Sequence, residues 1–359
     1  MNNSWFTRAL VAILIAGLTC GWAAPKTAEA AEPAASAKAA AKGHEDVSIE
    51  ILGAGQGGRG YILAHIFADV INKYGPPWLH ATSMATRGGV ENILLTYKDK
   101  KRRAKTVLYT PDTALFSAEL GKWDFKEKIT GLKLIGAVSV GSTFFVTLKP
   151  MKWSDLQGKK VVTDKAGSAK ANYLHDVLAN AGFPVTEQKI TLGQGKDALL
   201  AGMTDVISDF GVYTGKGKNI SCYPAVEELL FQKKGQVSFL TIPRDVIERA
   251  NKATGMGYRY LELPPEALLG VAKEPVGGLG ASVMWGMWPE MPDDVVEAIL
   301  KTYYENAEKF REYNSAGAGV DKETVAWMNF KTPEQVHPVA RKFYEEKKIK
   351  MGMPEKIKF

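Results

Sequence analysis

The sequence is poor in cysteine, with 2 among its 359 residues, Cys20 and Cys222. Two thiols allow at most one disulfide bridge. Catalytic motifs are also missing: there is no HExxH zinc motif, no GxSxG nucleophile elbow and no GxxxxGK[ST] phosphate loop. The sequence therefore favours a protein stabilised by its apolar core, and it offers no motif for an enzyme.

A strong excess of one charge is absent as well. The 46 Lys and Arg residues stand against 39 Asp and Glu residues, a net charge of +7, and the basic residues are spread along the chain. No nucleic-acid readout motif accompanies the densest basic run, Lys98–Arg103, so we interpret it as a solvated loop or helix end and expect no nucleic-acid partner. The apolar fraction of 45% and the length predict a globular chain with about two domains.

Long apolar runs are missing except near the N-terminus. Residues 9–24 (ALVAILIAGLTCGWAA) are apolar but shorter than the ~20 residues of a membrane-spanning helix. Residues 28–30 (AEA) follow with the pattern of a signal peptidase site, so we predict a signal peptide over 1–30 and export to the periplasm. A retained anchor and a lipid on Cys20 are the alternatives. Cleavage would leave Cys222 without a disulfide partner.

The rest of the chain divides into a linker and two predicted lobes. Residues 31–46 are rich in Ala with Pro, Ser and Lys, and they predict a flexible linker. Beyond them, strand-like and helix-like segments alternate, which predicts an α/β fold with parallel strands and crossover helices. We expect one lobe to comprise 47–148 plus 266–359 and the other 149–265, with a ligand cleft between them.

The expected elements follow from the spacing of apolar residues, which is two in a half-buried strand and three to four in a helix. Strands are expected at 47–51, 106–110, 132–140, 144–148, 161–163 and 205–208. Helices are expected around 63–71, 90–97, 174–178, 198–201 and 295–310.

Three glycine-bearing loops precede predicted helices. They are residues 53–61 (GAGQGGRGY), 86–92 (TRGGVEN) and 165–170 (KAGSAK). A helix N-terminus exposes unpaired backbone N–H groups and a partial positive charge, so such loops bind anions. Each loop also carries a basic side chain (Arg59, Arg87 or Lys170), and an arginine can bind a carboxylate through two parallel hydrogen bonds. If the loops converge, they suit a small organic anion; the alternative at each loop is a tight turn with a solvated charge.

The first loop also matches a dinucleotide-binding fingerprint, Gly53-x-Gly55-x-x-Gly58. That fingerprint requires an acidic residue at the end of a second strand about 20 residues further on. Residues 75–78 (GPPW) indicate no such strand. A nucleotide site is therefore not favoured.

The chain also carries an ordered series of short motifs. They are Gly57-Gly58-x-x-Tyr61, Gly89-Val90-Glu91-Asn92-Ile93-x-Leu95, Thr110-Pro111-Asp112, Leu156-x-Gly158-Lys159-Lys160-Val161, Gly167-Ser168, Gly202-x-x-Asp205 and His337-Pro338-x-Ala340-x-x-Phe343-Tyr344. In this order and spacing, over about Val47 to Lys347, the chain resembles the TAXI-type solute receptors of tripartite ATP-independent periplasmic (TRAP) transporters.

The resemblance implies a two-lobed type II periplasmic-binding fold with a hinge around Lys149 and near Glu266. It implies a receptor rather than an enzyme, which captures an organic anion or amino acid and delivers it to the permease subunits of a TRAP transporter. The chain departs from the family pattern at Arg59, where a small residue is usual, at Thr110, and at Lys170. The two basic departures add positive charge at the ligand loops and favour a more anionic ligand.

From the loops and the resemblance we expect one set of ligand contacts. These residues are Gly57, Gly58, Arg59, Tyr61, Arg87, Gly88, Glu91, Asn92, Thr110, Asp112, Gly167, Ser168, Lys170, Phe210 and Tyr213. We expect no cofactor, no metal and a monomer, although Glu91, Asp112 and Asp209 stay open as ligands of an assisting cation. The alternatives are an exported enzyme on the same scaffold, a receptor for an ABC importer or a sensor kinase, and a stress-related protein without a small ligand.

Overall fold

The structure is a computed structural model that describes residues 44–359 except Gly57, 216–218, 355–356 and 358–359. The predicted signal peptide at 1–30, Cys20 and most of the predicted linker lie outside the described residues. The same holds for Gly57 of the first glycine loop.

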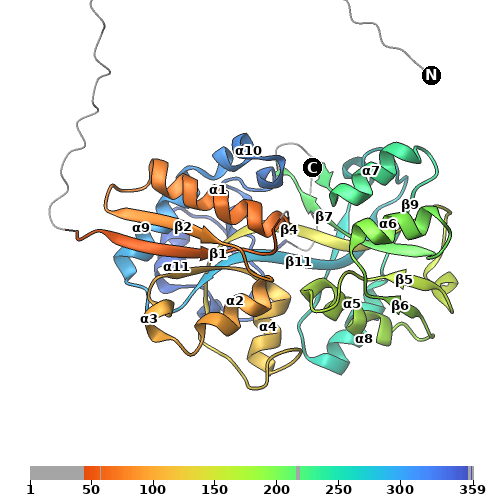
Figure 1. Cartoon of the computed structure of the whole chain (residues 1–359), viewed down its shortest axis with the longest axis horizontal. Coiled ribbons are helices and arrows are strands. Elements are labelled where there is room, and N and C mark those ends of the chain that lie inside the picture. The colour runs from red at the N-terminus through yellow and green to blue at the C-terminus, as the bar shows by residue number, and fades with distance from the viewer. Residues whose placement is uncertain (1–43, 57, 216–218, 355–356, 358–359) are drawn as a thin grey trace, which may run out of the picture. The chain divides into compact units, whose positions relative to one another are not determined.

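The described strands form one mixed sheet of eleven strands (Figure 1). Their order is β2-β1-β3-β11-β4-β7-β5-β6, and β10 pairs with β11, β8 with β7 and β9 with β4. The strands are β1 (Val47–Leu52), β2 (Leu79–Met84), β3 (Thr106–Pro111), β4 (Lys133–Thr147), β5 (Lys160–Val162), β6 (Thr186–Gln188), β7 (Val206–Tyr213), β8 (Ile220–Ser221), β9 (Ser238–Leu240), β10 (Arg259–Leu263) and β11 (Val276–Met287).

The helices gather around the two ends of this sheet. In Figure 1, α1, α2, α3, α4, α9 and α11 lie near β1, β2 and β3, whereas α5, α6, α7 and α8 lie near β5, β6 and β7. The helices are α1 (Arg59–Tyr74), α2 (Gly89–Thr96), α3 (Lys100–Arg103), α4 (Asp112–Leu120), α5 (Ala169–Ala179), α6 (Leu192–Leu200), α7 (Pro224–Gln232), α8 (Arg244–Thr254), α9 (Asp293–Glu305), α10 (Phe310–Tyr313) and α11 (Pro338–Glu346).

The expected α/β fold is confirmed, and the sheet is parallel only toward its two ends. β1 pairs in parallel with β2 and β3, and β5 pairs in parallel with β6 and β7. Between them, β11 runs antiparallel to β3 and β4, and β4 runs antiparallel to β7. The two long strands β4 and β11 therefore connect the two ends of the sheet, as Figure 1 shows.

The strands expected at 132–140 and 144–148 are a single strand, β4, so this expectation was wrong. The glycine between them, Gly141, does not break the strand. It instead lets β7 approach closely, because a Cβ at Gly141 would lie 2.2 Å from the carbonyl oxygen of Gly211. A glycine thus serves here for strand packing and not for a turn.

The expected helix at 295–310 is interrupted. α9 begins at Asp293, with acidic residues in its first turn as the sequence predicts, but it ends before Asn306. The Asn306 side-chain amide donates a hydrogen bond to the Thr302 carbonyl oxygen at 2.9 Å. A side chain that bonds to the backbone in this way competes with helix continuation, and the chain proceeds through a 3₁₀ turn at Ala307–Lys309 into the short α10.

The sequence analysis missed strand β2, which follows directly after residues 75–78. Its signal is weak but present, because Leu79 and Ala81 are buried and alternate with exposed neighbours. The strand ends at Met84 without an acidic residue, so the dinucleotide fingerprint of the first loop remains incomplete.

Helix α1 packs as its apolar spacing predicts. Its buried face includes Phe67, whose ring lies 4.8 Å from Trp285 of β11, 5.0 Å from Tyr303 of α9 and 6.0 Å from Phe310 of α10, measured between ring centroids. Aromatic pairs at these distances stabilise a core beyond their buried area. The C-terminal elements therefore pack against the first helix of the chain.

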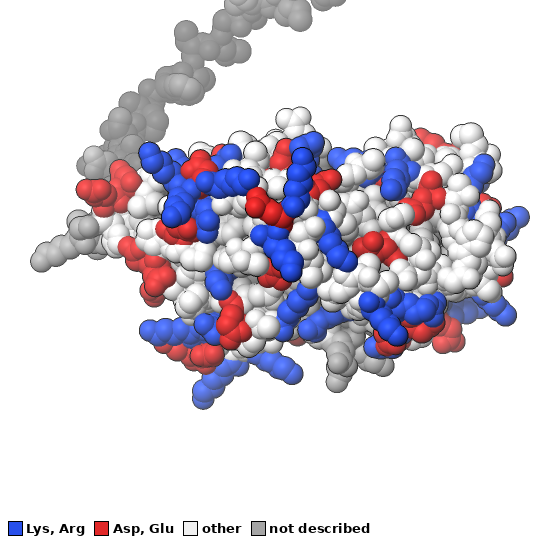
Figure 2. All heavy atoms as spheres, turned by 90° about the horizontal axis from the view of Figure 1, so that it is seen from below, with Lys and Arg blue, Asp and Glu red and all other residues white. Residues whose placement is uncertain are grey.

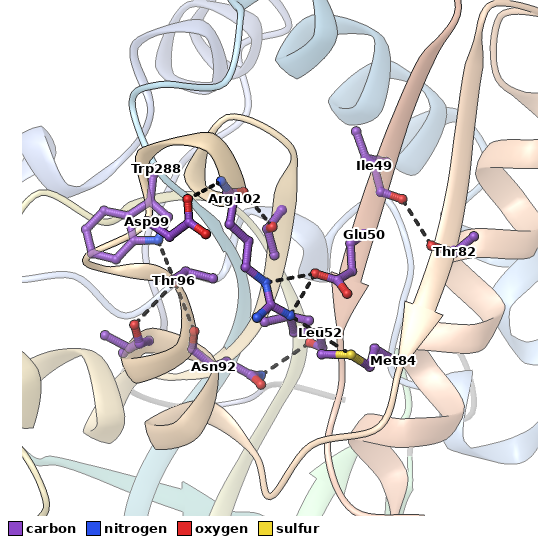
Figure 3. Close-up of polar contacts among 12 residues, drawn as sticks. Ile49, Glu50, Leu52, Thr82, Met84, Asn92, Thr96, Asp99, Arg102 and Trp288 are labelled. Carbon is purple, nitrogen blue, oxygen red and sulfur yellow. Dashed lines mark hydrogen bonds and ion pairs between the residues drawn. The ribbon is translucent and has the colours of Figure 1, made fainter.

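The basic run is only partly solvated. Arg102 donates two hydrogen bonds to Glu50, at 2.9 and 3.1 Å, and thereby joins α3 to β1 (Figure 3). Arg103 forms an ion pair with Glu290 at 2.9 Å, and its guanidinium lies 4.3 Å from the ring centroid of Trp288. Both arginines are thus held in half-buried ion pairs, which the charge pattern alone did not indicate.

Basic and acidic side chains are interspersed on the face of the molecule that Figure 2 shows. On this face the positive charge of the chain is therefore not gathered into one field. Such a mixed pattern is typical of a surface that faces solvent.

The C-terminal motif that begins at His337 is a helix cap. Nδ1 of His337 accepts a hydrogen bond from the Val339 backbone N–H at 3.3 Å, and Pro338 occupies the first turn of α11. Tyr344 on the buried face donates its hydroxyl to the Ile135 carbonyl oxygen at 2.9 Å, which fixes α11 to β4. Burial lowers the pKa of His337 below its ordinary value.

We predict that replacing Gly278 with Ala destabilises the fold by about 2 to 4 kcal/mol, because an added Cβ would lie 1.7 Å from the Thr143 carbonyl oxygen of β4. Gly193 in α6 has open space around it, so Gly193→Ala should raise the free energy of unfolding by about 0.5 to 1 kcal/mol. Urea unfolding of both variants tests this. Equal effects of the two substitutions would contradict the close approach of the strands.

We predict that His337 makes the fold acid-sensitive. Because its folded pKa is lowered, its contribution is fully present above the ordinary value of about 6.5 and is lost as the pH falls below that value. His337→Asn keeps a good helix cap but does not titrate. Urea unfolding between pH 7.5 and 5 should show wild type losing stability relative to His337→Asn; a constant difference between the two would contradict this prediction.

Candidate functional site

The three glycine loops meet in the structure. Thr86 of the second loop donates its backbone N–H to the Ala54 carbonyl oxygen at 3.2 Å and its hydroxyl to the Gly53 carbonyl oxygen at 3.0 Å. A Cβ at Gly55 would lie 3.8 Å from the Nζ of Lys165 in the third loop, and equally far from the Thr86 carbonyl oxygen. The first loop therefore lies between the other two.

Glycines in and beside the first loop let α1 start very close to the sheet. A Cβ at Gly53 would lie 2.9 Å from the Cβ of Ala64, and a Cβ at Gly60 would lie 2.6 Å from the ring of Tyr109 on β3. Gly58 caps the helix without a side-chain hydrogen bond. The N-terminus of α1 is thus held beside Tyr109.

Arg59, the first residue of α1, reaches across to β8. Its Nη2 donates a hydrogen bond to the Ser221 hydroxyl at 3.0 Å. Its Nη1 is buried, and no described residue accepts a hydrogen bond from it. A buried guanidinium nitrogen without an acceptor is unfavourable by itself, and a carboxylate would satisfy it.

Lys170, in the first turn of α5, is 6% exposed and also lacks a hydrogen-bond acceptor among the described residues. Its Nζ lies 3.7 Å from an Asp164 carboxylate oxygen and 4.5 Å from the ring centroid of Tyr223. Burial lowers the pKa of Lys170, and the negative charges of Asp164 and Asp209 oppose that shift. The ammonium group is therefore held near the protein interior by acidic neighbours and an aromatic face.

Asp209 on β7 provides the acidic counterpart. One carboxylate oxygen accepts hydrogen bonds from the backbone N–H groups of Phe210 at 2.8 Å and Tyr223 at 3.2 Å, and the other oxygen has no partner among the described residues. Burial raises the pKa of Asp209, and the charge of Lys170 opposes the shift. Cys222, a buried free thiol whose pKa burial raises, lies next to the same carboxylate.

The charge of Arg59 extends over the same region. Burial raises the pKa of Tyr109 to about 12 and raises that of Tyr223, and in both cases Arg59 opposes the shift. We therefore treat these groups as one site, the buried polar cluster. It consists of Arg59, Tyr109, Asp164, Lys170, Asp209 and Tyr223.

Several residues expected at the site lie elsewhere. The Arg87 side chain is 86% exposed and forms an ion pair with Glu91 at 3.0 Å. Gly88 adopts a positive φ of 117°, with open space where a side chain would lie. Tyr61 is half-buried and packs edge-on against His65, 4.3 Å between ring centroids. These residues lie near the loops, but their side chains form no hydrogen bond, ion pair or ring contact with the buried polar cluster among the described residues.

Asn92 and Asp112 instead hold the backbone together. The Asn92 amide donates to the carbonyl oxygens of Leu52, Gly53 and Tyr109, at 3.3, 2.9 and 2.9 Å; Figure 3 shows the bond to Leu52. Thr110 is buried and donates its hydroxyl to the Leu108 carbonyl oxygen at 3.2 Å.

Asp112 accepts hydrogen bonds from the Ser282 backbone N–H at 3.0 Å, the Asn329 amide at 2.6 Å and the Thr113 backbone N–H at 2.7 Å. Burial raises the pKa of Asp112 to about 6, although these hydrogen bonds oppose the shift. The carboxylate thus links the start of α4 to β11 and to the segment around Asn329.

The remaining expected residues have clear local roles. Ser168 caps α5 by accepting the Ala171 backbone N–H at 3.1 Å, and Gly167 before it has a positive φ of 79°. Phe210 and Tyr213 are buried in β7, and Tyr213 stacks on Trp327 at 5.5 Å between ring centroids. Within the described residues, no three His, Cys, Asp or Glu side chains gather in a way that would hold a metal ion.

Sequence reasoning named Arg59 and Lys170 but missed Tyr109, Asp164 and Tyr223 as their neighbours. Asp209 was the neighbour that the sequence indicated most clearly, because an acidic residue inside the apolar strand Val206–Tyr213 is unusual. Tyr223 gave none, since its role depends on the pairing of β8 with β7.

A second set of contacts, away from the cluster, joins the segment after α4 and the C-terminal part of the chain to the end of α8. Lys122, after α4, donates to the Thr254 carbonyl oxygen at the end of α8, and Lys331 donates to the Gly255 carbonyl oxygen at 3.5 Å. The C-terminus of a helix favours cations because its carbonyl groups are unpaired.

In the part of the chain that the structure describes, no helix is long and apolar enough to cross a membrane.

Comparison with solved structures finds periplasmic binding proteins. MatC from Rhodopseudomonas palustris with bound malate has 12% identity and a TM-score of 0.47, with 85% of this chain and 96% of that chain covered. A TctC solute-binding protein from Polaromonas has 14% identity and a TM-score of 0.46, with 76% and 88% covered. The aliphatic sulphonate binding protein SsuA from Escherichia coli has 13% identity and a TM-score of 0.42, with 87% and 96% covered. Malate and aliphatic sulphonate are named as ligands of those proteins only.

No curated protein sequence matches the chain. The sequence profile of the NMT1-like family, in contrast, matches residues 51–347, which include every strand and helix from β2 to α11. The match covers far more than half of the chain, and the chain therefore belongs to the NMT1-like family.

Proposed function

We propose that this protein is a periplasmic solute receptor that binds a small organic anion in the buried polar cluster. The observation that carries the proposal is the pair of buried cationic groups, Arg59 Nη1 and Lys170 Nζ, that lack hydrogen-bond acceptors at the junction of the three glycine loops. Leaving such groups unsatisfied is costly, and a carboxylate supplies the acceptors that both need. Binding of this kind requires no covalent chemistry.

The cluster also favours a ligand that can donate a hydrogen bond. The second carboxylate oxygen of Asp209 accepts no hydrogen bond from an N–H or O–H group of the described residues, and the neighbouring Cys222 offers only a weak thiol donor, so a hydroxyl or amino group on the ligand would complete it. The rings of Tyr109 and Tyr223 provide apolar walls beside the charges. A hydroxy acid or an amino acid satisfies these requirements better than a simple carboxylate.

We propose that the ligand enters by separation of two lobes, 47–148 plus 266–359 and 149–265. The Arg59–Ser221 hydrogen bond and the contacts of Lys122 and Lys331 with the end of α8 all cross this division. The long strands β4 and β11 would act as the hinge, because they run through both halves. Such a hinge motion is a common route of ligand capture.

The ordered motifs that resemble TAXI-type receptors support delivery to a TRAP permease and, with the N-terminal signal pattern, a periplasmic location. Within this proposal, Arg59 and Lys170 determine the preference for an anion. The hinge would then convert binding into a change of shape that a permease can recognise.

We predict that Arg59→Gln and Lys170→Met each weaken binding of the anion by roughly tenfold or more, because each removes a charge-assisted interaction. Thermal shift against hydroxy acids, amino acids and dicarboxylates would identify a ligand, and calorimetry would then measure its Kd. Arg249→Gln is the matched control, since Arg249 is exposed and pairs with Asp245 on α8. Unchanged affinity in both cluster variants would rule the cluster out as the ligand site.

We further predict that uptake of the identified ligand depends on this protein and on an ion gradient. Membrane vesicles from cells that carry the permease should accumulate labelled ligand when the purified protein is added, and dissipation of the ion gradient should stop uptake. ATP depletion with the gradient maintained should have no effect. Uptake that stops on ATP depletion and persists without the ion gradient would instead support an ABC importer as the partner.

A further inference from the structure

A cavity of about 460 Å³ lies apart from the buried polar cluster, between the start of β10 and the segments around Trp327 and Met351. None of the residues that line it belongs to the cluster. Its volume lies within the range of ~300 to 1,000 Å³ that small-molecule sites occupy.

The walls of this cavity are fixed by backbone and ring contacts. The backbone N–H of Gly352 donates to the Ala326 carbonyl oxygen at 2.9 Å, and that of Met353 donates to the Met328 carbonyl oxygen at 3.0 Å. Trp327 is held from behind by stacking on Tyr213 at 5.5 Å, and its carbonyl oxygen accepts the Ser282 hydroxyl at 3.0 Å. The cavity is therefore preformed.

The interior surface of the cavity is apolar and adaptable. Trp327 and Phe330 contribute half-buried aromatic rings, and Met328, Met351 and Met353 contribute thioether side chains. Methionine side chains fit irregular partners and make favourable contacts with aromatic rings. Such a lining suits a flat or bulky apolar group.

Charge at the cavity has one sign. Arg259 and Lys350 line it, and no Asp or Glu does. Both side chains are exposed, and neither forms an ion pair with a described residue, although burial raises the pKa of Asp112 and the positive charge of Arg259 opposes that rise. In contrast, Arg102 and Arg103 are held by glutamates. Arg259, which is exposed and acts on Asp112 only at a distance, can therefore also bind an anion from solution.

We propose that this cavity is a second binding site, which takes an organic anion with an aromatic body. The acidic group would bind Arg259, with Lys350 nearby, and the ring would pack against Trp327 and Phe330. An arginine beside aromatic walls both pairs with a carboxylate and stacks on its ring system.

The position of the site gives it a structural consequence. Arg259 begins β10, whereas the aromatic and methionine walls come from the C-terminal part of the chain. Met353 packs on β11, since a Cβ at Gly280 would lie 2.6 Å from the Met353 Cε. A bound anion would therefore connect β10 to the C-terminal segment across β11, and it would raise the thermal stability of the protein.

The test uses 2-naphthoate as the probe and 2-naphthalenemethanol as its uncharged match. Calorimetry on the whole protein should show saturable binding of 2-naphthoate and at least roughly tenfold weaker binding of the alcohol. Arg259→Gln should weaken 2-naphthoate binding by a similar factor, and Phe330→Ala should weaken it by removing a wall. Arg249→Gln, an exposed arginine on α8, should leave it unchanged.

Arg59→Gln separates this site from the buried polar cluster and should bind 2-naphthoate as wild type does. Loss of binding in Arg59→Gln, with Arg259→Gln unaffected, would place the probe in the cluster and overturn the proposal. Absence of saturable binding to wild type, or equal affinity for acid and alcohol, would overturn it as well.

Discussion

The close approach of β4 to its neighbours is the constraint on which the rest of the structure depends. Only glycine fits at Gly278 against the Thr143 carbonyl oxygen and at Gly141 against Gly211, so backbone meets backbone without side chains between. This packing lets β4 and β11 form a long antiparallel pair at the centre of the sheet. The parallel strands at each end of the sheet connect to these two strands, through β3 on one side and β7 on the other. The glycine loops at those ends are therefore positioned by β4 and β11.

Two uses of buried charge can be distinguished in the protein. Arg102 with Glu50 is a closed pair that joins α3 to β1, and its desolvation is offset within the pair itself. Arg59 and Lys170 differ because each keeps an unsatisfied donor even in the compact structure. The groups of a structural pair satisfy one another, whereas a binding site keeps donors for its ligand. Arg311 Nε is also buried without an acceptor among the described residues, so it is the convergence of Arg59 and Lys170 at the glycine loops that distinguishes the cluster.

The sequence was informative wherever a local pattern decides the outcome. Apolar spacing predicted β1, α1 and β3, and glycine-rich turns marked the loops that converge. It failed where tertiary contacts decide: Gly141 has the sequence character of a turn but serves strand packing, and Asn306 ends a helix whose apolar period continues. Arg59 and Lys170 could be named from their loops, but Tyr223 becomes their neighbour only through the pairing of β8 with β7.

The hydrogen bond between Arg59 and Ser221 has a thermodynamic consequence for recognition. It joins the start of α1 to β8, so under the proposed division into two lobes it would favour their closed arrangement without a solute. Under the proposed function, a solute that binds Nη2 must replace this hydrogen bond, whereas a solute that binds Nη1 gains an interaction that no described residue makes. A carboxylate has two oxygens and could bind both nitrogens through parallel charge-assisted hydrogen bonds, whereas a neutral solute would gain less. Arg59 would thus offer a solute one donor that already has a partner and one that has none.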